Sequence, residues 1–320
     1  MGRREFIMLL GGAAASWPFA AQPQQPAMMK RIAIVHPSEP VANLVASYHR
    51  FYHAFFAELG RVGYAEGNNL IVKRYSAGGQ PDRYAELARD VADTRQAATT
   101  TIPIVTIAGD PVVGGLVSNI ARPGGNITGT AISAGFEIWG KRMGLLKEVI
   151  PKLSNISVIL QTRKFWEGPN GTAIRQAAES ISIPLNAVTF EEKIDNAAYQ
   201  HVFAAFDQDR PDALMVSEFP VHFTNRVIIV QLAAKHRVPV LYTWREFVET
   251  GGLMSYAFDM VELGRSCAYQ IGQILNGTKP GDIPFNLVAR YELALNLKTA
   301  KSLDIEFPAT LLGIADFVVE

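Results

Sequence analysis

The chain has 320 residues, of which 48% are hydrophobic and 19% are charged, so it can bury a core and is long enough for two domains of ordinary size. Lysine and arginine together number 30, as do aspartate and glutamate, so no net charge favours nucleic acid or an anionic membrane. The single cysteine, Cys267, excludes an internal disulfide and has the surroundings of a small buried side chain. These properties predict a soluble α/β protein whose partner is small or locally recognised.

Residues 1–27 are typical of an export signal followed by a linker. Arg3 and Arg4 precede a short apolar run that ends in small residues, and a Pro- and Gln-rich stretch follows at 22–26. The apolar run is too short to cross a bilayer, which takes about 20 residues. The run Arg-Arg-Glu-Phe-Ile resembles a twin-arginine signal, so we expect the protein in the periplasm. A buried N-terminal helix is the alternative.

From Lys30 onward, short apolar runs alternate with segments of helical periodicity. In the first alternation the predicted strands cover residues 31–35, 70–72 and 102–107, and the predicted helices cover 47–59, 82–91 and a stretch after Gly109. A second alternation of the same kind follows, and such patterns favour parallel sheets covered on both faces. We therefore expect two doubly wound α/β lobes with a cleft between them. The predicted domains are 28–130, 131–283 and a tail, 284–320, that could return to the first lobe.

Several motifs, in their order and spacing, resemble those of one protein family. They are the run at 3–7, Thr101–Val105, Gly109–Pro111, Ala121–Gly129, Arg245–Val248, Gly251–Tyr256 and Asn296–Lys301. The chain is similar to the type I periplasmic binding proteins of the ABC-transporter group that includes tryptophan- and tyrosine-binding members. This resemblance implies a two-lobed fold with a hinge that closes on a small ligand, such as an amino acid, and docks on a membrane permease.

One departure from that family affects the first lobe. Family members carry a further strand and helix between the regions that correspond to Val91 and Ala97, so the first lobe here lacks one strand-helix unit of about 20 residues. The missing turn would lie at the carboxyl end of a central strand, where open α/β sheets bind ligands. A binding-impaired member of the family is therefore one alternative function, and an exported enzyme on a similar scaffold is another.

In the first lobe, polar residues at the predicted strand ends are candidates to bind a small zwitterion. Ser38 follows the first strand and Asp110 leaves the third, and either could contact the ligand or cap a turn or helix instead. Thr130 and Ser133 end the Asn-Ile-Thr-Gly segment, where a polar ligand contact and a hinge role are both open.

In the second lobe, Glu218 follows the predicted strand 213–216 and is the candidate to bind an ammonium group. Phe165 and Trp166 follow an earlier strand and could form an aromatic wall, with core packing as the alternative.

Three further candidates follow later strands of the second lobe. Trp244, Tyr256 and Asp259 converge if their strands are neighbours, although Asp259 could instead cap the next helix. The sequence therefore predicts a ligand site of mixed acidic, hydroxyl and aromatic character.

No metal, cofactor or catalytic group is expected. His49 and His53 lie four residues apart on one face of a predicted helix, but no third ligand stands at metal-site spacing. The sequence contains no nucleophile elbow, P-loop or complete dinucleotide fingerprint. We expect a monomeric binding protein, not an enzyme, that works with an ABC permease.

Overall fold

The computed structural model describes residues 29–80, 83, 86, 102–132, 137–191 and 194–320. The expected export signal and the expected deletion between Val91 and Ala97 lie outside the described residues, as does nearly all of the helix predicted at 82–91. Of the helices that are described, none combines the length and the hydropathy needed to span a bilayer.

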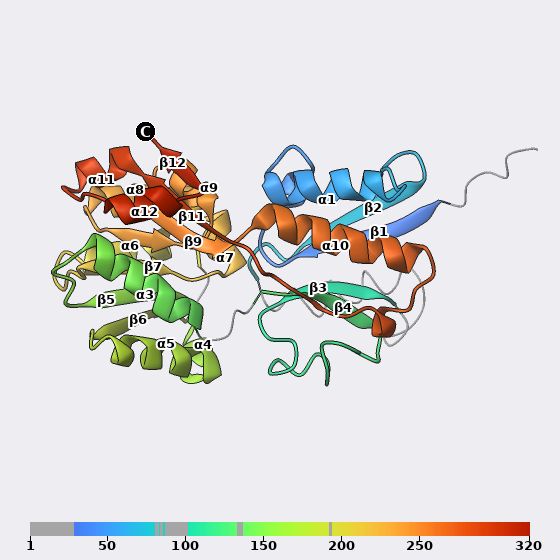
Figure 1. Ribbon diagram of the computed structural model, residues 1–320, viewed down its shortest axis with the longest axis horizontal. Coiled ribbons are helices and arrows are strands. Elements are labelled where there is room, and N and C mark those ends of the chain that lie inside the picture. Colours follow the sequence, from blue (N-terminus) through green and yellow to red (C-terminus); the bar gives the residue numbers. More distant parts are fainter. Residues whose placement is uncertain (1–28, 81–82, 84–85, 87–101, 133–136, 192–193) are drawn as a thin grey trace, which may run out of the picture.

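Two lobes lie side by side along the long axis of the molecule (Figure 1). The first lobe contains β1 (Lys30–His36), η1 (Val41–Asn43), α1 (Arg50–Arg61), β2 (Leu70–Ser76), β3 (Ile104–Ala108), β4 (Ile127–Ala131), α10 (Met260–Leu275), η3 (Pro280–Asp282) and β10 (Asn286–Leu287). The second lobe contains α3 (Glu137–Val149), β5 (Ile156–Thr162), α4 (Arg163–Glu167), α5 (Pro169–Ser180), β6 (Leu185–Phe190), α6 (Asn196–Ala205), β7 (Ala213–Val216), α7 (Pro220–Thr224), α8 (Arg226–Lys235), β8 (Val240–Tyr242), α9 (Arg245–Glu249), β9 (Met254–Phe258), β11 (Tyr291–Asn296), α11 (Leu297–Ser302), α12 (Ala309–Ile314) and β12 (Phe317–Val319).

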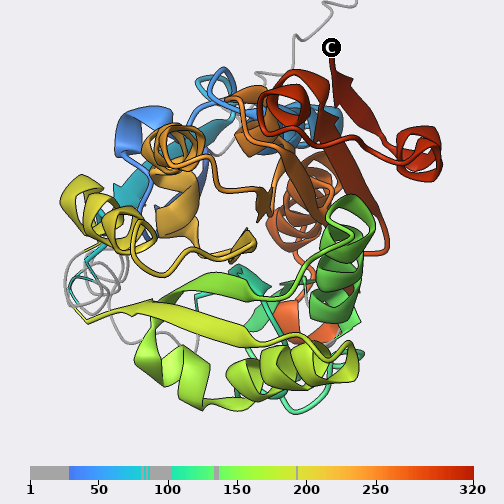
Figure 2. The ribbon, with the colours of Figure 1, turned by 90° about the vertical axis from the view of Figure 1, so that its left-hand side faces the viewer.

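The second lobe is built on one seven-stranded sheet with the strand order β12-β11-β9-β8-β7-β5-β6. The strands from β6 to β9 pair in parallel, whereas β11 runs antiparallel to β9. Every residue of β7 and β8 is buried, as expected for central strands with helices on both faces, and Figure 2 shows helices on both sides of the strands. The parallel strands therefore end together at one edge of the sheet.

The hydrophobic core has one cluster on each face of this sheet. The cluster on one face is closed by α3, α5, α11 and α12. The cluster on the other face continues into the first lobe through Phe55 and Leu59 of α1 and through Leu263 and Cys267 of α10. The buried position of Cys267 agrees with its predicted role as a small apolar side chain.

The first lobe contains two separate sheets within the described residues. Strands β1 and β2 pair in parallel, and β10, β4 and β3 form a second parallel sheet. Strands β1 and β3 have no fully buried residue, and Val35 and Ile107 are 50% and 42% exposed. A continuous parallel sheet would cover such side chains. Within the described residues the first lobe is therefore divided between these two sheets, and the expected deletion stays a prediction.

Helix α10 corrects the predicted domain boundaries, because it follows β9 of the second lobe but packs on the first. A Cβ atom at Gly264 would lie 2.4 Å from the carbonyl oxygen of Phe51 in α1, and Gln270 donates a hydrogen bond of 2.8 Å to the carbonyl of Gly129 in β4. Helical periodicity identifies the apolar face of α10 but not the sheet that it covers. The predicted second domain, 131–283, therefore includes a helix of the first lobe.

The C-terminal tail also divides between the lobes. Strand β10 pairs with β4 in the first lobe, whereas β11 and β12 extend the sheet of the second lobe. The chain thus passes between the lobes after β4, after β9 and after β10 (Figure 1). Three connections of this kind therefore join the two lobes.

The helix predicted after Gly109 is wrong, since residues 111–115 form only turns. The backbone N–H of Gly114 donates to the carbonyl of Asp110 at 2.9 Å, but no further helical turn follows. Two adjacent glycines, the second with φ +68°, disfavour a helix at this point.

Candidate functional site

The carboxyl edge of the second-lobe sheet carries a group of charged, hydroxyl and aromatic side chains. Glu218 lies just beyond β7 at this edge. Its Oε2 accepts a hydrogen bond of 2.8 Å from an amino group of Arg142 in α3. The side chain of Arg142 is 2% exposed and that of Glu218 is 32% exposed, so solvent reaches the pair from the carboxylate side.

Arg142 is a site residue that sequence reasoning missed. Its Nε donates to the carbonyl of Tyr256 at 3.0 Å, and its guanidinium lies 5.0 Å from the ring centroid of Trp139. The available signal was its position, since Arg142 stands on the buried face of α3, three residues after Trp139 and four before Leu146. A charge on the apolar face of a helix requires a partner of opposite charge.

Two stacked tyrosines lie beside this ion pair. The rings of Tyr256 and Tyr291 are 5.6 Å apart and nearly parallel. Burial raises the pKa of both phenols, and the Arg142 charge acts in the opposite direction on both. The Tyr291 hydroxyl is buried without a hydrogen-bond partner among the described residues. The tyrosine pair therefore offers an aromatic face together with a donor that is not used elsewhere.

Two hydroxyls continue the same edge. Ser217 and Thr243 are each 1% exposed, and neither hydroxyl has a hydrogen-bond partner in the part of the chain that the structure describes. Met215 pairs with Leu241, which pairs with Met254, so two residues further along, Ser217, Thr243 and Tyr256 fall in one row across three strands. Buried hydroxyls normally find a partner, so this row can receive a polar ligand.

The predicted aromatic wall is divided. The ring of Phe165 lies 4.7 Å from that of Phe219, one residue beyond Glu218, and so remains at the sheet edge. The Trp166 ring is instead covered by the guanidinium of Arg175 at 4.6 Å, and the Trp166 carbonyl accepts a hydrogen bond from the same arginine at 2.8 Å. Both aromatic residues are half-buried. Phe165 therefore remains a candidate ligand-binding residue, whereas Trp166 packs against α5.

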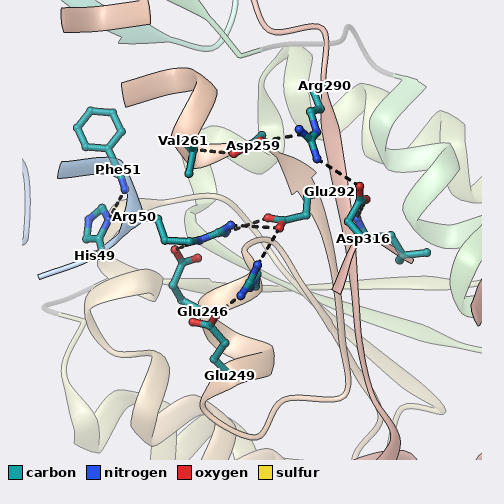
Figure 3. Close-up of polar contacts among 12 residues, drawn as sticks. His49, Arg50, Phe51, Glu246, Glu249, Asp259, Val261, Arg290, Glu292 and Asp316 are labelled. Atoms are coloured by element: carbon teal, nitrogen blue, oxygen red, sulfur yellow. Dashed lines mark hydrogen bonds and ion pairs between the residues drawn. The ribbon is translucent and has the colours of Figure 1, made fainter. Parts of the chain in front are cut away.

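Trp244, Tyr256 and Asp259 do not converge, contrary to the prediction. Trp244 packs against Phe223 and Phe258 in the core cluster of the opposite sheet face. The Asp259 carboxylate accepts a hydrogen bond of 2.8 Å from the backbone N–H of Val261 and so caps the N-terminus of α10 (Figure 3). This is the alternative role that the sequence left open for Asp259. Trp244 and Tyr256 lie on opposite faces of the sheet, and the register that decides this is not contained in the sequence.

The first-lobe candidates lie in different places. The Ser38 hydroxyl is 3.0 Å from that of Thr224 in the second lobe. Asp110 caps its own turn by accepting the N–H groups of two following residues, and it is exposed. Thr130 is 1% exposed, with its hydroxyl 2.7 Å from that of Ser266 in α10. Thr130 is therefore covered by α10, and Ser133 lies outside the described residues.

The lobes also contact each other through charged residues that sequence reasoning missed. Arg50, the first residue of α1, reaches Glu246 of α9 and Glu292 of β11 in the second lobe (Figure 3). Glu39 is 1% exposed, and its Oε2 accepts a hydrogen bond of 3.1 Å from Thr224. Glu39 comes from a loop and Arg50 from the start of α1, and the sequence around neither residue indicates a partner in the other lobe.

Two hollows are lined by residues other than those of this edge of the sheet. One, of about 720 Å³, lies between the start of α1 and α10 and includes His49, His53 and Arg265 in its lining. The other, of about 840 Å³, lies at the far end of the second lobe beside Pro308. No group of three or more potential metal ligands occurs among the described residues.

Comparisons with known proteins bear on both the fold and the family. The profile of a family described as ABC transporter substrate binding protein matches residues 58–319. A tyrosine-binding protein from Clostridioides difficile strain R20291 is 24% identical over 268 residues, which cover 79% of this chain and 76% of that protein.

Solved structures resemble the chain over most of its length. A conserved domain protein from Vibrio cholerae superposes with a TM-score of 0.78 at 23% identity, covering 91% of this chain and 99% of that one. An ABC domain in complex with L-Trp from Streptococcus pneumonia gives a TM-score of 0.73 at 19% identity, covering 91% of this chain and 100% of that one. These likenesses confirm the predicted two-lobed fold of type I periplasmic binding proteins.

Proposed function

Because the chain belongs to the ABC transporter substrate-binding protein family, we propose that it is the extracytoplasmic receptor of an importer and that it binds an amino acid between its lobes. The family works with ABC transporters, and its members are substrate-binding proteins, not enzymes. In this proposal the ligand contacts one lobe first, and a hinge rotation draws the other lobe over it. The permease then recognises the closed form.

The observation that carries the proposal is the group of side chains at the carboxyl edge of the second-lobe sheet. The Glu218 carboxylate suits the ammonium group of an amino acid, and the hydroxyls of Ser217 and Thr243 suit its carboxylate. The stacked rings of Tyr256 and Tyr291 suit an apolar or aromatic side chain.

Two relatives support an aromatic amino acid as the ligand. One is named a tyrosine-binding protein, and the other was solved with L-Trp bound. Tyrosine and tryptophan are therefore the first compounds to test, with the remaining amino acids as competitors.

Export through the twin-arginine route is part of the same proposal. Arg3 and Arg4 stand before a short apolar run, and a receptor that delivers solutes to a permease must lie outside the cytoplasm. The protein would reach the periplasm already folded and act there as a monomer without a cofactor.

A thermal-shift screen of the mature chain against the common amino acids and a set of aromatic acids tests the proposal, with calorimetry of each hit. A ligand at 100 times its Kd stabilises a protein by about 2.7 kcal/mol, which a melting curve resolves. Glu218→Gln should weaken binding about tenfold or more, whereas Glu179→Gln, on the exposed end of α5, should not. A cooperatively folded chain that binds no amino acid would overturn the proposal and favour a binding-impaired family member.

A further inference from the structure

We propose that direct contacts between the lobes form a latch that favours the closed cleft without the help of a ligand. The latch consists of Glu39 and Arg50 in the first lobe and Thr224, Glu246 and Glu292 in the second. Its effect on ligand affinity rests on the proposed function, but its effect on lobe closure does not. The latch residues would set how tightly the receptor binds without touching the ligand.

Arg50 is the charged centre of the latch (Figure 3). Its Nε lies 3.2 Å from Glu246, and its two amino groups donate to the two oxygens of Glu292 at 3.1 and 2.9 Å. A paired fork of this kind fixes direction as well as distance, so it tolerates little rotation between the lobes.

The acceptors of Arg50 are more buried than Arg50 itself. The side chains of Glu246 and Glu292 are 8% and 11% exposed, compared with 24% for Arg50. One oxygen of Glu246 is buried without a partner among the described residues. Partial burial lowers the pKa of Arg50, but the hydrogen bonds and charges of the two glutamates outweigh it and hold the pKa above its usual range. If the lobes separate, two crowded carboxylates lose the charge that compensates them.

A second contact lies beyond β1. The Glu39 carboxylate is buried between Asn43 of its own lobe, at 2.6 Å, and the hydroxyl of Thr224, at 3.1 Å. The Ser38 hydroxyl also reaches Thr224, at 3.0 Å. Thr224 therefore connects two first-lobe residues to the end of α7.

Aromatic contacts lie between these two polar connections. An amino group of Arg226 lies 3.3 Å from the Tyr48 hydroxyl, and the ring of His49 meets that of Phe223 edge-on at 5.4 Å. First-lobe residues from Ser38 to Arg50 thus contact α7, the start of α8, α9 and the start of β11 in the second lobe. Because all these contacts join protein atoms, closure by them needs no ligand.

Arg245 provides a matched control for Arg50. It lies 3.5 Å from the same carboxylate of Glu292, but it belongs to α9 and so makes this contact within the second lobe. Replacing either arginine by glutamine removes one positive charge near Glu292. Only Arg50→Gln removes a connection between the lobes.

The test measures the distance across the cleft in the full chain without ligand. Spin labels at Val113→Cys in the first lobe and Lys164→Cys in the second report this distance by pulsed dipolar spectroscopy. Both positions are exposed, and the native Cys267 is buried away from the label. In the ligand-free parent we expect a short and a longer distance together, and in Arg50→Gln we expect the ratio of the short to the longer distance to be reduced tenfold or more. Arg245→Gln should keep the ratio of the parent.

Thr224→Val supplies a second variant that preserves side-chain volume and should also lower the closed fraction. If Arg50→Gln does not fold, Thr224→Val decides alone. An unchanged distance distribution in the variants that fold would overturn the latch. Once an amino-acid ligand is found, Arg50→Gln should raise its Kd by the same factor as it lowers the closed fraction. Absence of any ligand would count against the proposed function but would leave the distance measurement valid.

Discussion

The Tyr199 hydroxyl lies 2.7 Å from Nδ1 of His222, and neither side chain is exposed to solvent. His222 belongs to α7, the helix that ends at Thr224, so this buried pair supports the segment that meets the first lobe. Nε2 of His222 has no hydrogen-bond partner among the described residues, and Phe190 and Phe219 surround the ring. Burial lowers the pKa of His222 to about 3, so the imidazole is neutral at pH 7.

This histidine predicts a loss of stability in acid. In the unfolded chain its pKa is near 6.5, so the unfolded state binds the proton first as the pH falls, and the free energy of unfolding drops between about pH 6.5 and pH 3. At pH 5 the His222 contribution should be about 2 kcal/mol smaller than at pH 7. Urea unfolding of the parent and of His222→Asn at both pH values measures this difference.

Asparagine does not titrate, so the variant should lose that part of the pH dependence. The dependence that remains should have the same sign, because burial also lowers the pKa of His36 and of His49 to about 4. Identical pH profiles for the parent and His222→Asn would show that His222 binds its proton equally well in both states.

The ion pair between Arg142 and Glu218 should contribute to the free energy of unfolding. Arg142→Met should lower the free energy of unfolding by about 2 to 4 kcal/mol, because it leaves Glu218 without its partner and the Tyr256 carbonyl without its donor. Adding Glu218→Gln should restore part of the loss, since the unpaired charge is then removed. A double-mutant cycle from denaturant titrations measures the coupling, and strictly additive losses would argue against a stabilising pair.

Much of the fold could be predicted from the sequence, because apolar runs and helical spacing alternate regularly from β1 to β9. The lobe to which α10 belongs could not, since an apolar face that includes Leu263 and Cys267 fits either sheet. The packing of α1 against α10 depends on the close approach of the two helices at Gly264. Nothing in the sequence distinguishes this glycine from the other 25.

The candidate site was predictable where it depends on the ends of strands and not where it depends on register or on distant partners. Glu218 follows β7 and reaches the sheet edge as expected. Asp110 and Asp259 also follow strands, but their carboxylates accept hydrogen bonds from nearby backbone N–H groups. A short carboxylate after a strand can either cap the backbone in this way or contact a ligand, and the sequence does not distinguish the two. Arg142 pairs with Glu218 across 76 positions of sequence, and no local pattern reveals such a pair.

The packing of α10 on α1 predicts a specific effect of adding one methyl group. A Cβ at Gly264 would lie 2.4 Å from the Phe51 carbonyl, so Gly264→Ala must push the helices apart and should cost about 1 to 3 kcal/mol. Gly140 in α3 has nothing within 4 Å of the same position, so Gly140→Ala should instead stabilise by about 0.5 to 1 kcal/mol. Thermal and denaturant unfolding of both variants measure the contrast, and equal effects would contradict the close approach.

Replacing Thr243 should weaken ligand binding without lowering the free energy of unfolding. Its hydroxyl is buried and has no hydrogen-bond partner among the described residues, so Thr243→Val replaces an unsatisfied group by a methyl of similar size and should be neutral or stabilising. Thr128 is equally buried but donates a hydrogen bond of 2.7 Å to the carbonyl of Ile283, so Thr128→Val should cost about 1 to 3 kcal/mol. Denaturant titration compares the two variants directly.

For ligand binding we expect the opposite order, because the Thr243 hydroxyl at the end of β8 can contact a bound amino acid, whereas the Thr128 hydroxyl beneath α10 cannot. Calorimetry with the ligand found in the amino-acid screen should give about a tenfold weaker Kd for Thr243→Val and an unchanged Kd for Thr128→Val. A loss of stability in Thr243→Val as large as in Thr128→Val would mean that the Thr243 hydroxyl is already satisfied and is not held in reserve for a ligand.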